Sequence, residues 1–127
     1  MVAAIGVPEP GTACQVMIGY AYYAIQWISP YAVLGMVHVL EGLSVILANK
    51  VADAVQHSLG GDRGFSYLRS HGALDVNHIA FFKTLVNGFE DCETQDIIID
   101  TARVIYRLYG AIFEELGPHA AETHNAA

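Results

Sequence analysis

The sequence predicts an all-α protein built as a bundle of about four helices. Apolar residues recur at helical spacing, no useful run alternates as a strand does, and the helix breakers glycine and proline fall between the periodic stretches. The 127 residues suffice for one domain with one core. We expect a lead-in at residues 1–11, the helical domain at 12–117 and a flexible tail at 118–127.

The first two predicted helices are separated by a proline. Thr12 and Gln15 have the spacing of a capping box, so the first helix should begin at about residue 13. Ser29-Pro30 should end it at about residue 28, because proline lacks the N–H that a helix interior needs. The second helix should run over residues 31–59 and end at Gly60-Gly61.

The third and fourth predicted helices follow the same logic. The third should occupy residues 65–87 and stop at Gly88, and the polar stretch 90–94 should be a loop or cap. The fourth should run over residues 94–116 and end before Gly117-Pro118. Its apolar side chains form one stripe at 100° per residue, made by Ile98, Ala102, Ile105, Leu108, Tyr109, Ile112 and Leu116.

Composition excludes two classes of protein. Hydrophobic residues make up 54% and charged residues 15%, which is the opposite of a disordered chain. The net charge of −7 argues against a nucleic-acid binder, which needs a basic surface. Two cysteines and the lack of a basic segment before the first apolar residues fit a cytoplasmic protein with free thiols.

Residues 11–40 contain no Asp, Glu, Lys or Arg, which makes this stretch long enough for a membrane span. Pro30, Gln15, Gln26 and the missing flanking cations oppose that interpretation, so we expect two helices buried in a bundle and no membrane. Four helices offer too little surface to cover all these apolar residues. We therefore expect a homo-oligomer or a partner chain.

The third helix carries the most informative pattern. His71, Asp75 and His78 fall within about 60° of one another on its apolar face. Burying a carboxylate with two imidazoles costs several kcal/mol unless they share a partner, and a divalent cation is the simplest partner. Imidazole and carboxylate suit non-haem iron, manganese or zinc. The alternative is a neutral, hydrogen-bonded His–Asp pair without metal.

The second helix supplies one more candidate ligand. Glu41 is the only charged residue between Gly11 and Ala48, and it shares a face with apolar residues, so its carboxylate should be buried beside the third helix. His38 lies about 60° away and one turn earlier. We expect His38 to support the metal ligands through a hydrogen bond or to be an ordinary core histidine.

These residues carry a family resemblance. The stretch YAVLGMVHVLE at residues 31–41, followed by His71-x3-Asp75-x2-His78, resembles the haem-oxygenase-like di-metal oxidases, also called iron-containing redox enzymes. The resemblance implies a haem-oxygenase-like helical bundle in which Glu41, His71, Asp75 and His78 bind the metal. It also implies activation of O2 for oxidation of small organic substrates, including fatty acids and amino acids. Fe(II) is the expected metal and manganese the alternative.

The sequence departs from this family in one respect. The family has an earlier helix with Glu and His ligands, whereas the forty residues before Glu41 contain no Glu-x6-His. The chain thus resembles the C-terminal portion of such an enzyme. A di-iron site would need ligands from another segment or chain, so the chain is truncated, completed by a partner, or a single-metal relative.

Two other functions compete with the metal-dependent oxidase. One is a non-catalytic helical subunit or fragment that keeps the fold and needs a partner chain. The other is a haem-binding helical protein that uses one histidine as axial ligand, which would leave Asp75 and His78 without a role. On the oxidase hypothesis, four side chains should line a dry pocket beside the metal: Tyr67, Leu74, Phe82 and Leu85.

Overall fold

The computed structural model describes residues 9–59 and 66–124, without the side chains at 59, 66, 67, 71–73 and 118–124. The all-α prediction is confirmed, because the described residues form helices and no strand. The elements are α1 (Thr12–Tyr23), the short π-helix η1 (Ala24–Ile28), α2 (Ala32–Leu59), α3 (Ser66–Asn87) and α4 (Cys92–His124).

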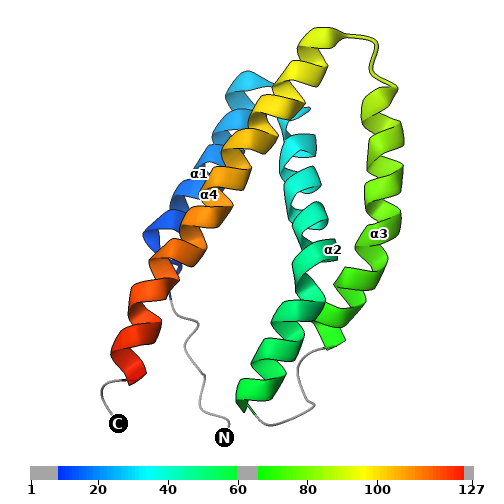
Figure 1. Ribbon diagram of the computed structural model, residues 1–127. Helices are drawn as coiled ribbons and strands as arrows, with labels where there is room; N and C mark the ends of the chain where they lie inside the picture. Colours follow the sequence, from blue (N-terminus) through cyan, green and yellow to red (C-terminus); the bar gives the residue numbers. More distant parts are fainter. Residues whose placement is uncertain (1–8, 60–65, 125–127) are drawn as a thin grey trace, which may run out of the picture.

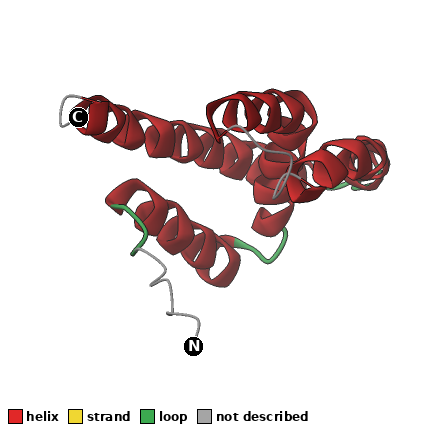
Figure 2. Ribbon diagram, turned by 90° about the horizontal axis from the view of Figure 1, so that it is seen from below, coloured by secondary structure: helices red, strands yellow, loops and turns green. Residues whose placement is uncertain are grey.

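The helices form an open row in the order α3, α2, α4, α1 (Figure 1). α2 packs against α3 on one side and against α4 on the other, and α1 lies along α4. The view from below shows α1 at the edge of the row, with α4 on one side of it (Figure 2). Each outer helix therefore has one main neighbour, which limits how much of its surface is covered.

Within the described residues, the segment Ala32–Ser58 in α2 meets the length and hydropathy expected of a membrane span. A helix from the core of a soluble protein meets the same test. The uncharged stretch at residues 11–40 does not form one continuous helix, because α1 and η1 end at Ile28 and α2 begins at Ala32.

The start of α1 differs from the sequence prediction. No capping box forms at Thr12 and Gln15: the side-chain amide of Gln15 donates instead to the carbonyl oxygen of Pro10. The carboxylate of Glu115 in α4 accepts hydrogen bonds from the backbone N–H groups of Thr12 and Ala13, at 2.9 and 2.8 Å. A residue about one hundred positions away therefore caps α1, since an anion is favourable at a helix N-terminus.

The predicted break at Ser29-Pro30 is confirmed. The N–H of Ser29 donates to the carbonyl oxygen of Ala24 at 3.0 Å, which closes the wide turn of η1. The Ser29 hydroxyl then accepts a hydrogen bond from the N–H of Tyr31. Ala24 is fully buried, so this turn fixes the position of α1 relative to α2.

The junction between α3 and α4 contains a side-chain cap. The carboxylate of Asp91 accepts hydrogen bonds from the N–H groups of Glu93 and Thr94 and from the Thr94 hydroxyl. These hydrogen bonds, led by that of the Thr94 hydroxyl, lower the pKa of Asp91, because they favour the ionised form. The predicted cap within residues 90–94 is therefore confirmed, and it starts α4 two residues earlier than expected.

The predicted end of the fourth helix is wrong. The expected stop at Gly117-Pro118 does not occur, because α4 continues through both residues to His124. Proline already has a helical φ and removes a single backbone hydrogen bond, so a helix that is otherwise continuous can pass through it at a cost. The ends of α2 and α3 agree with the prediction.

The core holds small side chains where the helices cross. Eight hydrophobic residues are buried in the described chain: Ala24, Ala32, Val39, Ala48, Ala52, Phe82, Ile98 and Ile105. At the crossing of α2 and α4, a Cβ added to Gly35 would lie 2.5 Å from the carbonyl oxygen of Ile98 and 2.8 Å from the backbone nitrogen of Ala102. Only glycine allows α2 and α4 to approach this closely.

We expect Gly35→Ala to lower the free energy of unfolding by about 1–3 kcal/mol, because its methyl group must push two backbones apart. Gly42→Ala is the matched control on the same helix, since its Cβ would meet only the side chain of Ile79 at 3.8 Å. That control should raise stability by up to about 1 kcal/mol through helix propensity. Urea unfolding measures both, and equal effects would contradict the close crossing.

We expect Glu115→Ala to lower stability by about 1 kcal/mol, because two N–H groups of α1 lose their acceptor. Amide hydrogen exchange at Thr12 and Ala13 should accelerate together with the loss of thermal stability. Glu114→Ala, which removes the neighbouring carboxylate, should change neither measurement. Unaltered exchange at the start of α1 in the Glu115 variant would show that α4 does not hold this helix end.

Candidate metal centre

Three of the four predicted ligands meet at the contact between α2 and α3. Glu41 comes from α2, while Asp75 and His78 lie three residues apart on α3. Their candidate ligand atoms all lie within 4.8 Å of one another. The Nδ1 atom of His78 is 3.4 Å from Oε1 of Glu41 and 3.3 Å from Oδ1 of Asp75. The helical phase of α3 therefore brings both of its ligands to one side of Glu41.

The three groups differ in burial. Asp75 is 4% exposed, Glu41 is partly buried, and 54% of the His78 side chain is exposed. The carboxylates form the inner part of the cluster and the imidazole forms its outer edge. Two carboxylates share one imidazole, so with both carboxylates ionised a single positive charge on His78 would leave the cluster negative. A bound cation would balance the negative charge of the carboxylates, whose burial otherwise costs free energy.

The geometry of the cluster suits a divalent cation. Ligands bound at about 2.1 Å to one ion lie about 3.0 Å apart in octahedral and about 3.4 Å apart in tetrahedral coordination. The 3.3 and 3.4 Å separations from Nδ1 of His78 fall in this range. Two carboxylate oxygens and one imidazole nitrogen are also the donor types that non-haem iron and manganese take. The residues present therefore fit such an ion.

Two predicted site residues stay outside the described cluster. His71 belongs to α3, one turn before Asp75, but its side chain lies outside the described residues, so its role remains a prediction. His38 is exposed and its ring stacks on Phe82, with centroids 5.1 Å apart and planes inclined by 24°. Its proposed support of the metal ligands also remains a prediction.

The residues expected to form a dry pocket around the metal are only partly placed as predicted. Phe82 is buried, whereas Leu74 and Leu85 are 54% and 40% exposed, and the side chain of Tyr67 lies outside the described residues. α3 packs mainly on α2, so α2 covers a narrow sector that includes Asp75. Leu74 and Leu85 lie on the edge of the apolar face that α2 leaves open.

The pocket that the structure shows at the cluster has a volume of about 310 Å³. Its lining combines the cluster with four residues from α2, α3 and α4: Leu40, Ser44, Leu68 and Tyr109. Tyr109 belongs to the predicted apolar stripe of the fourth helix, and nothing in that stripe connects it to the metal ligands. Helical periodicity gives the stripe of one helix, but it does not say which residue of that stripe faces a site on another helix.

The same four residues also line an adjoining apolar groove of about 430 Å³. This metal-side groove continues along α2 and α4 past Leu43, Leu47, Ala48, Val51 and Phe113. The described residues that line it include no Lys or Arg. The cluster therefore opens onto an apolar surface. Among the described residues that line this surface, the charged groups are those of the cluster itself.

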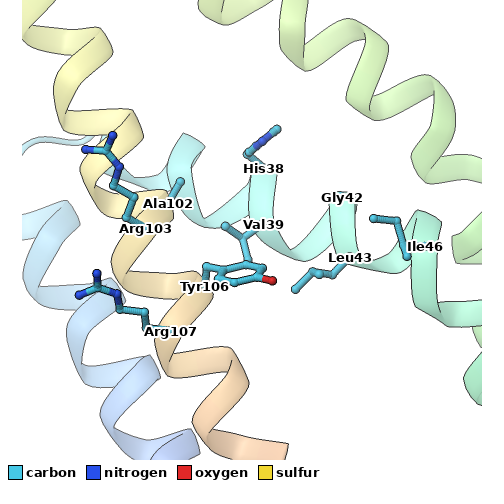
Figure 3. Close-up of a pocket in the computed structure, with 9 residues that line it drawn as sticks. All are labelled: His38, Val39, Gly42, Leu43, Ile46, Ala102, Arg103, Tyr106 and Arg107. Atoms are coloured by element: carbon cyan, nitrogen blue, oxygen red, sulfur yellow. The ribbon is translucent and has the colours of Figure 1, made fainter.

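A second groove lies on the other side of α2 and has a volume of about 550 Å³ (Figure 3). Arg103 and Arg107 of α4 lie beside it, and His38 and Ile46 line it from α2. Arg103 pairs with Asp100 at 2.9 Å. We call it the arginine-side groove. It contains none of the three clustered ligands, so the cations and the candidate metal centre lie on opposite sides of α2.

Fold and site together define an all-α protein with a carboxylate–histidine cluster suited to a non-haem metal. The chain belongs to the family described as iron-containing redox enzyme, whose family model it matches over residues 5–110. This match includes α1 to α3, most of α4 and all four predicted ligands. No curated protein and no solved structure gives a significant match. The match to the family model confirms the family resemblance carried by residues 31–41 and 71–78.

We expect the protein loaded anaerobically with Fe(II) to keep about one ion per chain after desalting. Glu41→Gln combined with Asp75→Asn should keep none, because two anionic ligands are lost. Asp53→Asn is the matched control, since Asp53 pairs with Arg69 on the surface. His71→Ala should also reduce occupancy, which tests the ligand whose side chain the structure does not describe. Equal metal content in the wild type and the double variant would remove the proposed centre.

Proposed function

We propose that this protein is a non-haem, iron-dependent oxidase or oxygenase that acts on a small organic substrate with O2, with manganese as the alternative metal. Family membership supports an oxidoreductase. The observation that carries the proposal is the buried carboxylate of Asp75 beside Glu41 and His78. Burying the Asp75 carboxylate beside a second carboxylate is costly without a cation. A haem-binding site would use one histidine and would leave Asp75 without a role.

In this proposal the three clustered residues bind the metal from sides that differ in exposure to water. Asp75 and Glu41 would anchor Fe(II) from the protected side, and His78 would complete the cluster at the solvent edge. Iron held by this donor set would supply electrons to O2 while leaving coordination positions open for reactants. The Tyr109 side chain lines the same pocket and can hydrogen-bond to a substrate there.

The substrate class follows from the metal-side groove. Its walls are apolar, and the carboxylates of the cluster are its only anionic groups. A substrate with a charged group at its far end would find no counter-ion there and would lose hydration. We therefore infer a substrate with an apolar body and a single polar end directed at the metal. This favours such molecules over free amino acids.

A non-catalytic subunit is the second candidate. The observation that favours it is the exposure of His78, which leaves one side of the described cluster open to water. A subunit of this kind would bind metal and lack turnover until a partner chain closed the site. Cytoplasmic localisation remains part of the proposal, argued from the two free cysteines.

Oxygen uptake by the Fe(II)-loaded protein tests the enzyme. We expect uptake with straight-chain compounds that carry one polar end, with an oxidised product seen by mass spectrometry, and none with free amino acids. Leu47→Lys places a cation in the metal-side groove and should raise KM at least tenfold with metal content unchanged. Ile46→Lys, on the arginine-side groove, is the matched control and should leave KM as it is.

Three outcomes separate the candidates. Metal binding without oxygen uptake with any compound would favour the non-catalytic subunit. An equal rise in KM for Leu47→Lys and Ile46→Lys would contradict the assignment of the metal-side groove as the substrate site. A Soret band on titration with haemin, lost in a single histidine variant, would favour the haem-binding alternative instead.

A further inference from the structure

Three of the six Lys and Arg residues of this acidic chain lie along one depression. Arg103 and Arg107 border the arginine-side groove, and Lys83 borders a hollow of about 320 Å³ that adjoins it. The groove and the hollow are continuous, because His38, Ala102 and Arg103 line both of them. We call the two together the cationic depression.

The described lining of the cationic depression includes no Asp or Glu. Among the described residues, neither Lys83 nor Arg107 has an ion-pair partner. Arg103 pairs with Asp100 through one Nη atom, and both side chains are 71% exposed. A surface pair of this kind is weak, and the other N–H groups of the guanidinium can still donate to an anion. The net charge of −7 repels anions from the chain as a whole, whereas this depression attracts them.

Apolar side chains line the depression beside these cations. Ile46 of α2 and Ile99 and Tyr106 of α4 are exposed there. The guanidinium groups of Arg103 and Arg107 lie at the α4 edge of the groove, and the Tyr106 ring lies between α4 and α2 (Figure 3). Small-molecule ligands fill cavities of about 300–1,000 Å³ with mostly apolar walls and a few polar groups. Both parts of the depression fall in that range.

The combination of cations and apolar wall defines the class of ligand. A bare phosphate or sulfate would leave the wall exposed to water, and a neutral apolar molecule would not use the cations. An acidic protein segment is also a poor fit, because its peptide groups that face the wall need hydrogen bonds. Apart from the arginines, His38 and Tyr106 are the polar side chains among the described residues that line the groove.

We propose that the cationic depression binds an organic anion that has an apolar body. The anionic group lies beside Arg103 and Arg107, and the apolar body covers Ile46 and Tyr106. This binding site is separate from the candidate metal centre, which lies on the other side of α2. The proposal therefore holds whether or not the metal centre turns over a substrate.

Isothermal titration calorimetry with naphthoate tests the site, and the uncharged naphthamide is the matched ligand. We expect about one naphthoate to bind per chain. Naphthamide should bind at least about tenfold more weakly, because it has the same apolar body and no charge for the arginines. Added salt should weaken the binding of naphthoate alone, because salt screens exposed charges. Equal affinities for the two ligands would overturn the proposal, because anion recognition would be absent.

Arg103→Gln combined with Arg107→Gln tests the cations. This double variant should weaken naphthoate binding at least about tenfold, because the charge beside the anionic group is lost. Lys50→Gln combined with Arg69→Gln is the matched control, since it removes the same charge and neither residue lines the depression. The control should bind naphthoate as the wild type does. Equal losses in both double variants would overturn the proposal, because only the net charge of the chain would then matter.

Two neighbouring residues of α2 test the location. Ile46→Glu places a carboxylate in the cationic depression and should abolish naphthoate binding, whereas Leu47→Glu, on the metal-side groove, should preserve it. Far-ultraviolet circular dichroism checks that each variant is folded. Glu41→Gln combined with Asp75→Asn should also preserve binding, which separates this site from the metal centre.

Three further results would overturn the proposal. Loss of naphthoate binding in Leu47→Glu but not in Ile46→Glu would place the ligand in the metal-side groove. Displacement of naphthoate by inorganic phosphate at equal concentration would show that the apolar body adds nothing. Binding of a polyglutamate peptide without binding of naphthoate would identify an acidic protein segment as the partner.

Discussion

Asp75 places a carboxylate at the contact between α2 and α3, where it is almost inaccessible to water. Among the described residues, the group beside Asp75 that can carry a positive charge is the imidazole of His78. The same imidazole also lies beside Glu41. One imidazole carries at most one positive charge, so it can balance only one of the two carboxylates when both are ionised. A well-packed apolar residue at position 75 would hold the two helices together at lower cost. The carboxylate therefore makes sense as part of a cation site rather than as a packing element.

The position of α2 connects this constraint to the rest of the fold. α2 touches both α3 and α4, and the contact with α4 is close because Gly35 has no side chain. That approach brings Tyr109 and Phe113 of α4 beside the groove that begins at the cluster. A wider crossing would separate the apolar wall from the ligands. The close crossing at Gly35 thus places the apolar wall of the groove beside the candidate metal centre.

The convergence of Glu41, Asp75 and His78 was predictable because these residues obey helical periodicity. Glu41 stands out as a lone charge in an apolar segment, and Asp75 and His78 share a face of the next helix, so their convergence follows from the sequence. The partners on other helices did not follow. Nothing local in Thr12 or Gln15 indicates that Glu115 caps α1. Contacts of this kind depend on how helices are placed relative to one another.

The placement of the helices also explains why Leu74 and Leu85 do not line the dry pocket that was predicted for them. Leu74 and Leu85 lie in an apolar sector of α3, and a helix surrounded by neighbours would bury both. α3 is the last helix of an open row and is covered mainly by α2, so the buried sector narrows to the side of Asp75 and Phe82. Sequence periodicity gives the apolar face of a helix, but the number of neighbouring helices decides how much of that face is covered.

The open row also separates two of the uncovered surfaces of the described chain. α3, which carries Asp75 and His78, lies at one end of the row, and α1 lies at the other end along α4 (Figure 1). A partner seated on the outer face of α1 and η1 would therefore leave the edge of the cluster at His78 open to small molecules. Exposure at α1 and exposure at α3 have the same cause, because each terminal helix has one main neighbour. Their chemistry differs because one helix lacks charged residues altogether and the other carries ligands for a cation.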